Sequence, residues 1–166
     1  VKVDMGSPIL TPAEIPVVAD GDKVVDESIL VDGKEYHMTC VSMGNPHAVV
    51  YVDDVDNLPI EEIGPKFENH ERFPRRVNTE FVKVKSRMEI DMRVFERGCG
   101  ITLACGTGAC ASVVACVLNN LTENKVKVNL LGGPVFIEWQ GSADDKEQDI
   151  FLIGSANYSF FADYIL

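Results

Sequence analysis

Residues 104–118 read ACGTGACASVVACVL, a stretch without a single charged side chain. A helix that is apolar on almost every side is buried, so the rest of the chain has to enclose this one. Gly106 and Gly108 allow the backbone to approach another group closely at the start of the helix. Thr107 is the expected N-cap, because a hydroxyl can accept a hydrogen bond from a free N–H of the first turn. The fold should therefore be organised around this helix.

The start of the same helix is also the first candidate for chemistry. Unpaired N–H groups there form a site for an anion. The helix dipole should favour the thiolate of Cys105, which makes this residue a candidate base or nucleophile. The alternative is that Cys105 is a small buried apolar residue. Cys110 and Cys116 lie inside the apolar run and are expected in the core, whereas Cys99 stays undecided.

Runs with strand character lie on both sides of the helix. Two pairs are expected hairpins, because each pair is separated by a turn dipeptide, Asp32-Gly33 or Gly132-Gly133. The predicted strands are residues 23–31, 34–42, 47–52, 81–84, 88–95, 125–131, 134–140, 149–154 and 157–165, with a polar loop at 142–148. The sequence thus predicts an α+β domain, in which about eight mostly antiparallel strands curve around one central buried helix.

Two segments complete the expected organisation. Residues 1–20 contain three prolines, which argue against a long helix and suggest an extended interdomain segment leading into a domain at 21–166. Residues 56–70 have apolar positions three and four apart, typical of a short helix with Pro59 near its first turn. Its acidic residues are expected to be a solvated face and not a metal site; they are Glu61, Glu62, Glu68 and Glu71.

Composition limits the class of partner. Hydrophobic residues make up 46% of the 166 residues and charged residues 25%, as in one globular domain. The net charge of −11 argues against a nucleic acid or an anionic membrane surface. Five cysteines without a C-x-x-C pair and no visible signal segment suggest reduced thiols and a cytoplasmic protein, and no apolar run is long enough to cross a membrane.

Three motifs carry a resemblance to a known family. Residues 96–110, with Glu96-Arg97-Gly98 and ACGTGAC, are similar to the second catalytic-cysteine motif of the diaminopimelate epimerases. Residues 41–47 (VSMGNPH) and 75–81 (RRVNTEF) resemble two other motifs of that family, in the same order and at similar intervals. The resemblance covers essentially the whole chain and implies the family's fold, in which two such domains face each other across a cleft.

The resemblance also implies roles for individual residues. Cys105, Glu96 and His47 would be catalytic, and the substrate would be bound by Asn45, Asn78, Glu96, Arg97 and the N–H groups of Gly106 and Thr107. Without the resemblance, Asn45 could simply cap a turn and His47 could be an ordinary packed or surface histidine. Glu96 and Arg97 could likewise be one member of a salt bridge and one exposed charge, because neighbours in a strand point to opposite faces.

The implied reaction is the conversion of LL-diaminopimelate to meso-diaminopimelate by two cysteines, without a cofactor or a metal, in lysine and peptidoglycan precursor biosynthesis. The second cysteine would belong to an upstream N-terminal domain, so this chain would supply half of the active site and be inactive alone. A homodimer stays open as the assembly. The alternatives are an amino-acid racemase of the proline-racemase type, which has a related Cys-Gly-Thr-Gly motif, and a ligand-binding domain without catalysis.

Overall fold

The computed structural model describes residues 1–145 and 147–164. Within this part of the chain, ten strands form one sheet in the order β1-β10-β9-β8-β6-β5-β4-β3-β2, and β7 pairs with β6 outside that path. The elements, in chain order, are β1 (Lys2–Asp4), β2 (Glu27–Val31), β3 (Lys34–Ser42), β4 (Pro46–Tyr51), α1 (Ile60–Glu68), β5 (Asn78–Ser86), β6 (Glu89–Glu96), β7 (Gly100–Ile101), α2 (Gly106–Leu118), β8 (Lys125–Leu130), β9 (Gly133–Trp139) and β10 (Ile150–Ile153).

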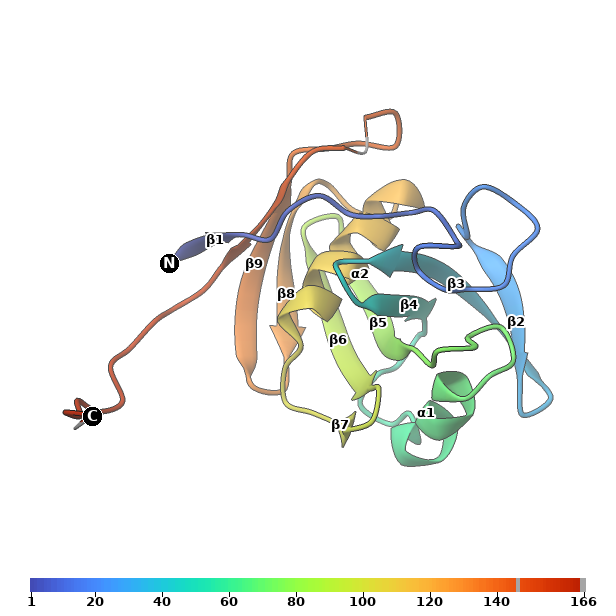
Figure 1. Cartoon of the computed structure of the whole chain (residues 1–166), viewed down its shortest axis with the longest axis horizontal. Coiled ribbons are helices and arrows are strands. Elements are labelled where there is room, and N and C mark those ends of the chain that lie inside the picture. Colours follow the sequence, from blue (N-terminus) through green and yellow to red (C-terminus); the bar gives the residue numbers. More distant parts are fainter. Residues whose placement is uncertain (146, 165–166) are drawn as a thin grey trace.

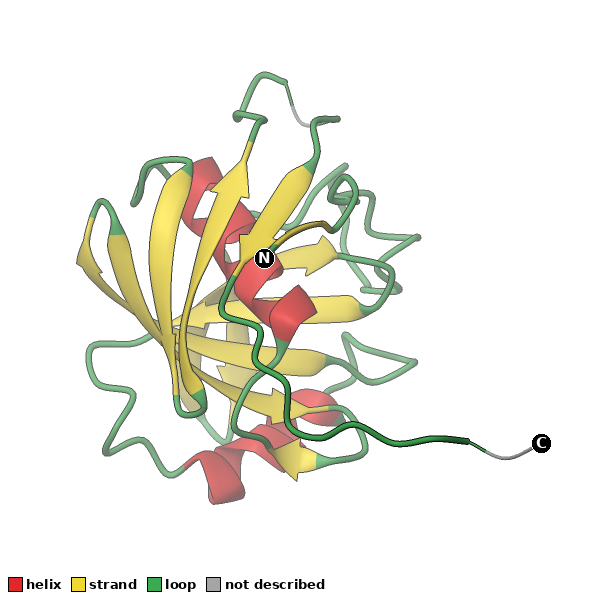
Figure 2. Ribbon diagram, turned by 90° about the vertical axis from the view of Figure 1, so that its left-hand side faces the viewer, coloured by secondary structure: helices red, strands yellow, loops and turns green. Residues whose placement is uncertain are grey.

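The sheet curves around α2, as Figures 1 and 2 show. The helix packs against β3, β4, β5, β9 and β10, and every residue from Gly108 to Cys116 is buried. This enclosure follows from a helix that has no polar face to offer to water. The predicted α+β class with a central buried helix agrees with this arrangement.

Strand pairing is mostly antiparallel, as expected, with two exceptions. β4 runs parallel to β5, and β6 runs parallel to β8. A parallel neighbour requires a crossover connection, and here α1 lies in the first crossover and α2 in the second. The two helices are therefore the connections that place parallel strands side by side.

Alternation along the strands divides the apolar residues into two cores. Val49 on β4 and Val82 on β5 face the α2 side and pack with Ala109 and Val113 of the helix. Their neighbours on the opposite face of the sheet pack in a second cluster, which includes Phe67 of α1. Side chains at even and odd positions thus have different surroundings, as the period of two requires.

Both predicted hairpins are present. β2 pairs with β3 across Asp32-Gly33, and β8 pairs with β9 across the turn at Leu131–Gly132. Asp32 and Gly33 both have positive φ values, 55° and 75°, which a tight primed turn needs. The assignment of Cys110 and Cys116 to the core is also confirmed, because neither is exposed.

Three details of the sequence prediction were wrong. Residues 157–164 form no strand; the chain there runs away from the domain (Figure 1), and residue 165 lies outside the described part. The first helix begins at Ile60 and not at residue 56, because Pro59 occupies its N-cap. Glu68 is buried and not solvated, since its carboxylate accepts hydrogen bonds from Arg76 at 3.2 Å and from the backbone N–H of Gly98 at 2.7 Å.

Residues 1–20 contain no helix, as predicted, and they contact the domain along much of their length. β1 extends the sheet by pairing with β10, and Ile9 bridges to Ser42. Ile15 is completely buried in the second core. The proposed boundary at residue 20 stays a prediction. Among the described residues, no helix is both long and apolar enough to cross a membrane.

Candidate active site

Cys105 lies at the first position before α2 and is the N-cap of the helix. Its backbone is extended, with φ −134° and ψ 110°, and its sulfur accepts a hydrogen bond from the backbone N–H of Gly108 at 3.3 Å. The expectation that Thr107 is the N-cap was therefore wrong, because the helix begins at Gly106, two residues earlier than a helix capped by Thr107 would. The Thr107 hydroxyl instead lies 3.5 Å from the Cys105 sulfur.

The proton of Cys105 is held more firmly than the helix dipole alone would suggest. Burial and, after it, the nearby Glu80 carboxylate raise the pKa of the Cys105 thiol, while the hydrogen bonds from Thr107 and Gly108 act in the opposite direction. Removing a thiolate from water and placing it beside a carboxylate both disfavour the charge. The expected preference for the thiolate is thus reversed in this chain, where the thiol is the favoured form.

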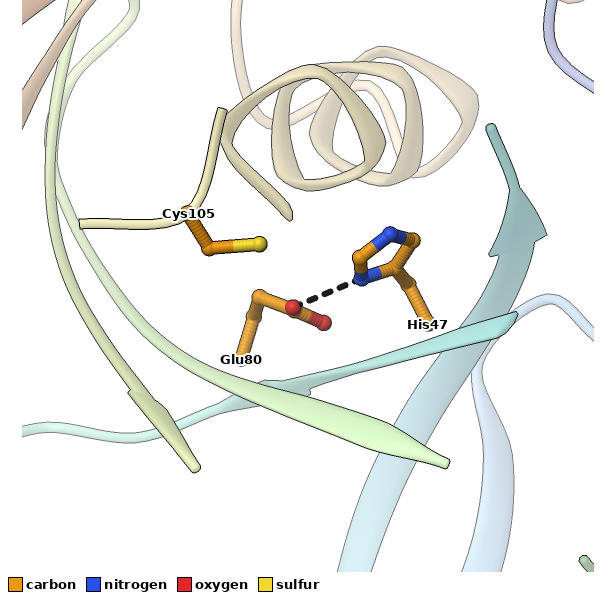
Figure 3. Close-up of side chains that lie close together, drawn as sticks. All are labelled: His47, Glu80 and Cys105. Atoms are coloured by element: carbon orange, nitrogen blue, oxygen red, sulfur yellow. Dashed lines mark hydrogen bonds and ion pairs between the residues drawn. The ribbon is translucent and has the colours of Figure 1, made fainter. Parts of the chain in front are cut away.

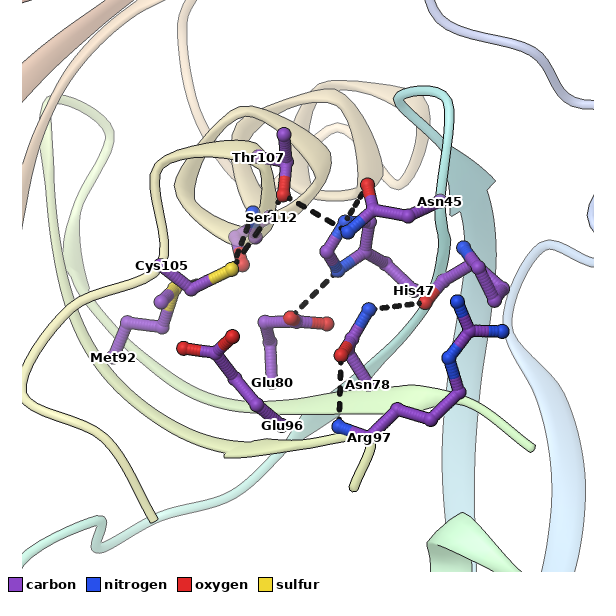
Figure 4. Close-up of polar contacts among 12 residues, drawn as sticks. Asn45, His47, Asn78, Glu80, Met92, Glu96, Arg97, Cys105, Thr107 and Ser112 are labelled. Atoms are coloured by element: carbon purple, nitrogen blue, oxygen red, sulfur yellow. Dashed lines mark hydrogen bonds and ion pairs between the residues drawn. The ribbon is translucent and has the colours of Figure 1, made fainter. Parts of the chain in front are cut away.

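His47 lies in the same cluster and is bonded through both ring nitrogens (Figures 3 and 4). Its Nδ1 is 2.7 Å from Oε1 of Glu80, and its Nε2 is 2.9 Å from the side-chain oxygen of Asn45. The Asn45 amide nitrogen in turn donates to the Thr107 hydroxyl at 3.3 Å. A chain of hydrogen bonds therefore connects Glu80, His47 and Asn45 to the first turn of α2.

Glu80 is the residue of this cluster that the sequence analysis missed. It lies in β5, where Asn78, Glu80 and Val82 alternate onto the face that looks toward α2. The parallel register sets Asn78 opposite His47 and Glu80 opposite Val49, so all three polar side chains share one face. A carboxylate within a buried strand is the signal that could have identified it, because such a group needs a partner.

Asn78 joins two of the predicted site segments. Its amide nitrogen donates to the carbonyl of Pro46 at 2.9 Å, and its side-chain oxygen accepts from the backbone N–H of Arg97 at 2.9 Å. The Arg97 guanidinium donates to the Arg75 carbonyl at 3.1 Å. These contacts bring the three motifs of the sequence together at one end of the strands.

Glu96 and Arg97 diverge at the end of β6, as expected for neighbours in a strand. In Figure 4 the Glu96 carboxylate points toward Cys105 and Glu80, whereas Arg97 extends to the side of Asn78. The Glu96 carboxylate accepts a hydrogen bond from the Thr102 hydroxyl. Both side chains are half-buried, so each combines a fixed position with access to solvent.

The first two N–H groups of α2 remain available. Within residues 1–145 and 147–164, the backbone N–H groups of Gly106 and Thr107 have no hydrogen-bond acceptor. The next two N–H groups donate to the Cys105 sulfur and carbonyl. Gly106 is exposed and Thr107 is half-buried. Two oriented donors at a helix start can bind a carboxylate.

The same cluster is a candidate metal site by residue type. One ligand atom each from His47, Glu80 and Cys105 lie within 4.8 Å of one another, and these are ligands that zinc accepts. The 2.7 Å between Nδ1 and Oε1, however, is the distance of a strong hydrogen bond. We therefore interpret the cluster as a hydrogen-bonded acid and base group.

The fold is similar to that of two solved structures. The chain is similar to a hydroxyproline epimerase from Agrobacterium vitis (TM-score 0.61, 14% identity, 91% of this chain and 48% of that chain). It is also similar to a probable proline racemase from Agrobacterium radiobacter K84 (TM-score 0.60, 12% identity, 92% of this chain and 49% of that chain). At such low identity the likeness establishes the fold alone.

Comparison of sequences identifies the family, which the likeness of folds does not. The sequence model of the family Diaminopimelate epimerase matches residues 39–159. The chain is 54% identical to the diaminopimelate epimerase of Agathobacter rectalis, over 96% of this chain and 57% of the relative, and 54% identical to that of Acetivibrio thermocellus, over 94% and 54%. The chain belongs to the diaminopimelate epimerase family. It spans a little over half the length of these curated relatives.

Proposed function

We propose that this chain is the catalytic C-terminal half of a diaminopimelate epimerase, which converts LL-diaminopimelate to meso-diaminopimelate. The observation that carries the proposal is the position of Cys105: its sulfur lies at the start of α2, beside His47, Glu80 and the free N–H groups of Gly106 and Thr107. Family membership supplies the substrate, because both relatives named above are diaminopimelate epimerases.

The arrangement suits proton transfer at an α-carbon. Inversion needs a base on one face of the carbon and an acid on the other, since one group alone would return the proton to the side it left. Cys105 would serve one face, and because its thiol form is favoured it would deliver a proton there. A second cysteine in the upstream domain would serve the other face, so the reaction needs no cofactor.

The remaining residues would bind and orient the amino acid. The N–H groups of Gly106 and Thr107 would hold the α-carboxylate and stabilise the negative charge that grows as the proton leaves. Asn45 lies beside this position through its contact with Thr107, Asn78 would be a further substrate contact, and the half-buried carboxylate of Glu96 is placed to meet the substrate ammonium. The Arg97 guanidinium, which lies on the side of Asn78, could meet a second carboxylate.

Two features support the need for an upstream domain. The relatives are nearly twice as long as this chain. In addition, the described part of the C-terminal segment exposes a run of aromatic rings, Tyr158, Phe160, Phe161 and Tyr164, each at least 79% accessible. Large contiguous apolar surfaces in a soluble protein mark interaction sites. The upstream domain would cover these rings and close the open side of the cleft.

The test is exchange of the α-proton of LL-diaminopimelate in heavy water, followed by NMR. The chain alone and the chain joined to an upstream segment from a relative are compared. We expect exchange and epimerisation in the joined protein, and little or none in the chain alone. Normal turnover by the chain alone would refute the half-site proposal. Exchange of proline and not diaminopimelate by the joined protein would refute the substrate.

A matched pair of variants tests the role of Cys105 in the joined protein. Cys105→Ala should abolish epimerisation, because no other described thiol lies at the site. Cys99→Ala should leave the activity near the wild-type level, because Cys99 is exposed in the turn after β6. Substantial activity of the Cys105→Ala variant would show that another cysteine is the acid and base.

A further inference from the structure

The His47 and Glu80 side chains form a hydrogen-bonded pair that water does not reach. Both side chains have 0% relative accessibility, and the contact between them is 2.7 Å. Burying a carboxylate or an imidazolium alone is very unfavourable, so each needs the other. A paired charge at this depth is unusual in a core, and it lies directly against the proposed catalytic thiol.

The hydrogen bonds indicate where the protons are. Each ring nitrogen of His47 faces an oxygen atom: Oε1 of Glu80 and the side-chain oxygen of Asn45. The Asn45 amide nitrogen is placed against the Thr107 hydroxyl, and its oxygen faces the ring. A ring nitrogen that faces an acceptor must carry a proton. If both nitrogens donate in these two contacts, the ring is an imidazolium.

We propose that Glu80 is the positioning residue of this site, whose carboxylate holds His47 as an oriented imidazolium next to Cys105. The catalytic role of Glu80 rests on the proposed function. The charge of the His47 ring does not depend on that function. Neither the motifs of the sequence nor the comparisons assign a role to Glu80.

The first turn of α2 is shaped to admit this carboxylate. A Cβ atom at Gly108 would lie 2.5 Å from Oε1 of Glu80 and 3.1 Å from the Cys105 sulfur. Real Cβ atoms do not approach so closely, so the glycine leaves the space that Glu80 occupies. The second carboxylate oxygen, Oε2, is buried and has no partner among the described residues. An unpaired oxygen of this kind is tolerable when a full opposite charge lies beside it.

The pair gives the thiol a nearby countercharge. The ring nitrogen and the Cys105 sulfur are among the atoms that lie within 4.8 Å of one another. When Cys105 gives its proton to the substrate, the thiolate that remains faces an imidazolium already fixed in place. Glu80 acts through His47, because the direct effect of its carboxylate on Cys105 is to disfavour the thiolate.

The first test measures the ring directly and needs no activity. The full-length protein is labelled with ¹⁵N-histidine, and the ring nitrogens are observed by NMR near neutral pH, with His47→Gln used to assign the signal. We expect His47 to show two protonated nitrogens in the wild type and to lose one proton in Glu80→Gln. A neutral His47 ring in the wild type would overturn the proposal, and so would a ring that is unchanged in Glu80→Gln.

The second test measures turnover in the same variants. Glu80→Gln should lower kcat by roughly 10- to 100-fold, the usual loss for a residue that orients a reacting group, with a smaller change in KM. Glu80→Asp keeps the charge and should restore part of both the imidazolium signal and kcat. Glu138→Gln, a surface carboxylate on β9 paired with Lys2, is the control and should change neither.

The two tests separate the possible failures. An imidazolium in a protein that does not epimerise diaminopimelate would refute the proposed function and leave the ion pair standing. An active Glu80→Gln protein with wild-type kcat would refute the positioning role. If Glu80→Gln does not fold, the wild-type ring charge and the Glu80→Asp variant still decide the question.

Discussion

The side-chain oxygen of Asn78 accepts a hydrogen bond from the backbone N–H of Arg97 at 2.9 Å. The opposite end of the same amide donates to the Pro46 carbonyl. Asn78 therefore fixes the start of β4 relative to the end of β6, and with them the segments that carry His47 and Glu96.

Replacing Asn78 with alanine should destabilise the domain, because it removes the partner of a half-buried N–H and of a buried carbonyl. Each such group costs about 1–3 kcal/mol. Urea unfolding should show a loss of that order, and epimerisation by the joined protein should fall as well. Asn57→Ala is the control: its side chain bonds to Asp54 on an exposed loop, so its stability should change by less than about 0.5 kcal/mol. An Asn78→Ala protein of wild-type stability would contradict the bridging role.

Gly108→Ala should be poorly tolerated although alanine is the better helix former. The new Cβ would meet the Glu80 carboxylate and the Cys105 sulfur, so the first turn of α2 would have to shift. We expect a loss of stability of about 1–3 kcal/mol, the usual cost of overpacking, together with a large loss of epimerisation. Gly21→Ala is the matched control, since its Cβ would meet no atom closer than 3.4 Å. A stabilised, active Gly108→Ala protein would show that the space is not needed.

Much of the fold follows from local patterns that the sequence displays. The charge-free run at 104–118 predicts the buried helix, and Asp32-Gly33 predicts a hairpin because few other dipeptides accept two positive φ values. The strand predicted at 157–165 was wrong for a physical reason. Its residues have strand propensity, but residues 157–164 lie beside no other strand of the described chain. An unpaired strand has no hydrogen-bond partners.

The site residues that belong to a sequence motif could be predicted, whereas those that only the packing of the strands brings to the site could not. Cys105 follows from its glycine-rich surroundings, whereas Glu80 belongs to the site because β4 and β5 run parallel and set it on the face of His47. That register is a long-range property that neighbouring residues do not encode. The favoured form of Cys105 was missed for the same reason, since the opposing charge comes from β5 and not from the helix itself.

Alkylation should distinguish the thiols in the chain. Iodoacetamide reacts with the thiolate, so near neutral pH Cys99, which is exposed, should be modified before Cys105, whose pKa is raised by burial and by Glu80. The rate at Cys105 should increase as the pH rises. Peptide mass spectrometry provides the measurement, and protein unfolded in urea, where the sites become equivalent, provides the control. Faster modification of Cys105 than of Cys99 at neutral pH would favour the helix-dipole interpretation instead.

Alkaline solution should destabilise the domain through its core thiols. Burial raises the pKa of both Cys110 and Cys116 to about 12, whereas an unfolded cysteine has a pKa of about 8.5. Above that lower value the unfolded chain loses protons that the folded chain keeps, so the free energy of unfolding falls as the pH rises toward 12. The slope approaches about 1.4 kcal/mol per pH unit for each thiol.

The comparison that isolates this effect is the double variant Cys110→Ala and Cys116→Ala. It removes both thiols, so its free energy of unfolding should depend less steeply on pH in the alkaline range, although it is less stable near neutral pH. Urea unfolding at a series of pH values measures both slopes. Equal slopes for the variant and the wild type would contradict the burial of these protons.

The aromatic C-terminal segment should matter only when the upstream domain is present. In this chain Tyr158, Phe160 and Phe161 are exposed, so changing all three to serine should alter the stability of the chain alone by less than about 0.5 kcal/mol. In the joined protein the same change should cost more, because burying one such side chain contributes about 1.5–3 kcal/mol. Asn157→Ala is the control and should be neutral in both proteins. Equal stability losses in the chain alone and in the joined protein would mean that the upstream domain does not contact these rings, because such a contact can contribute only where that domain exists.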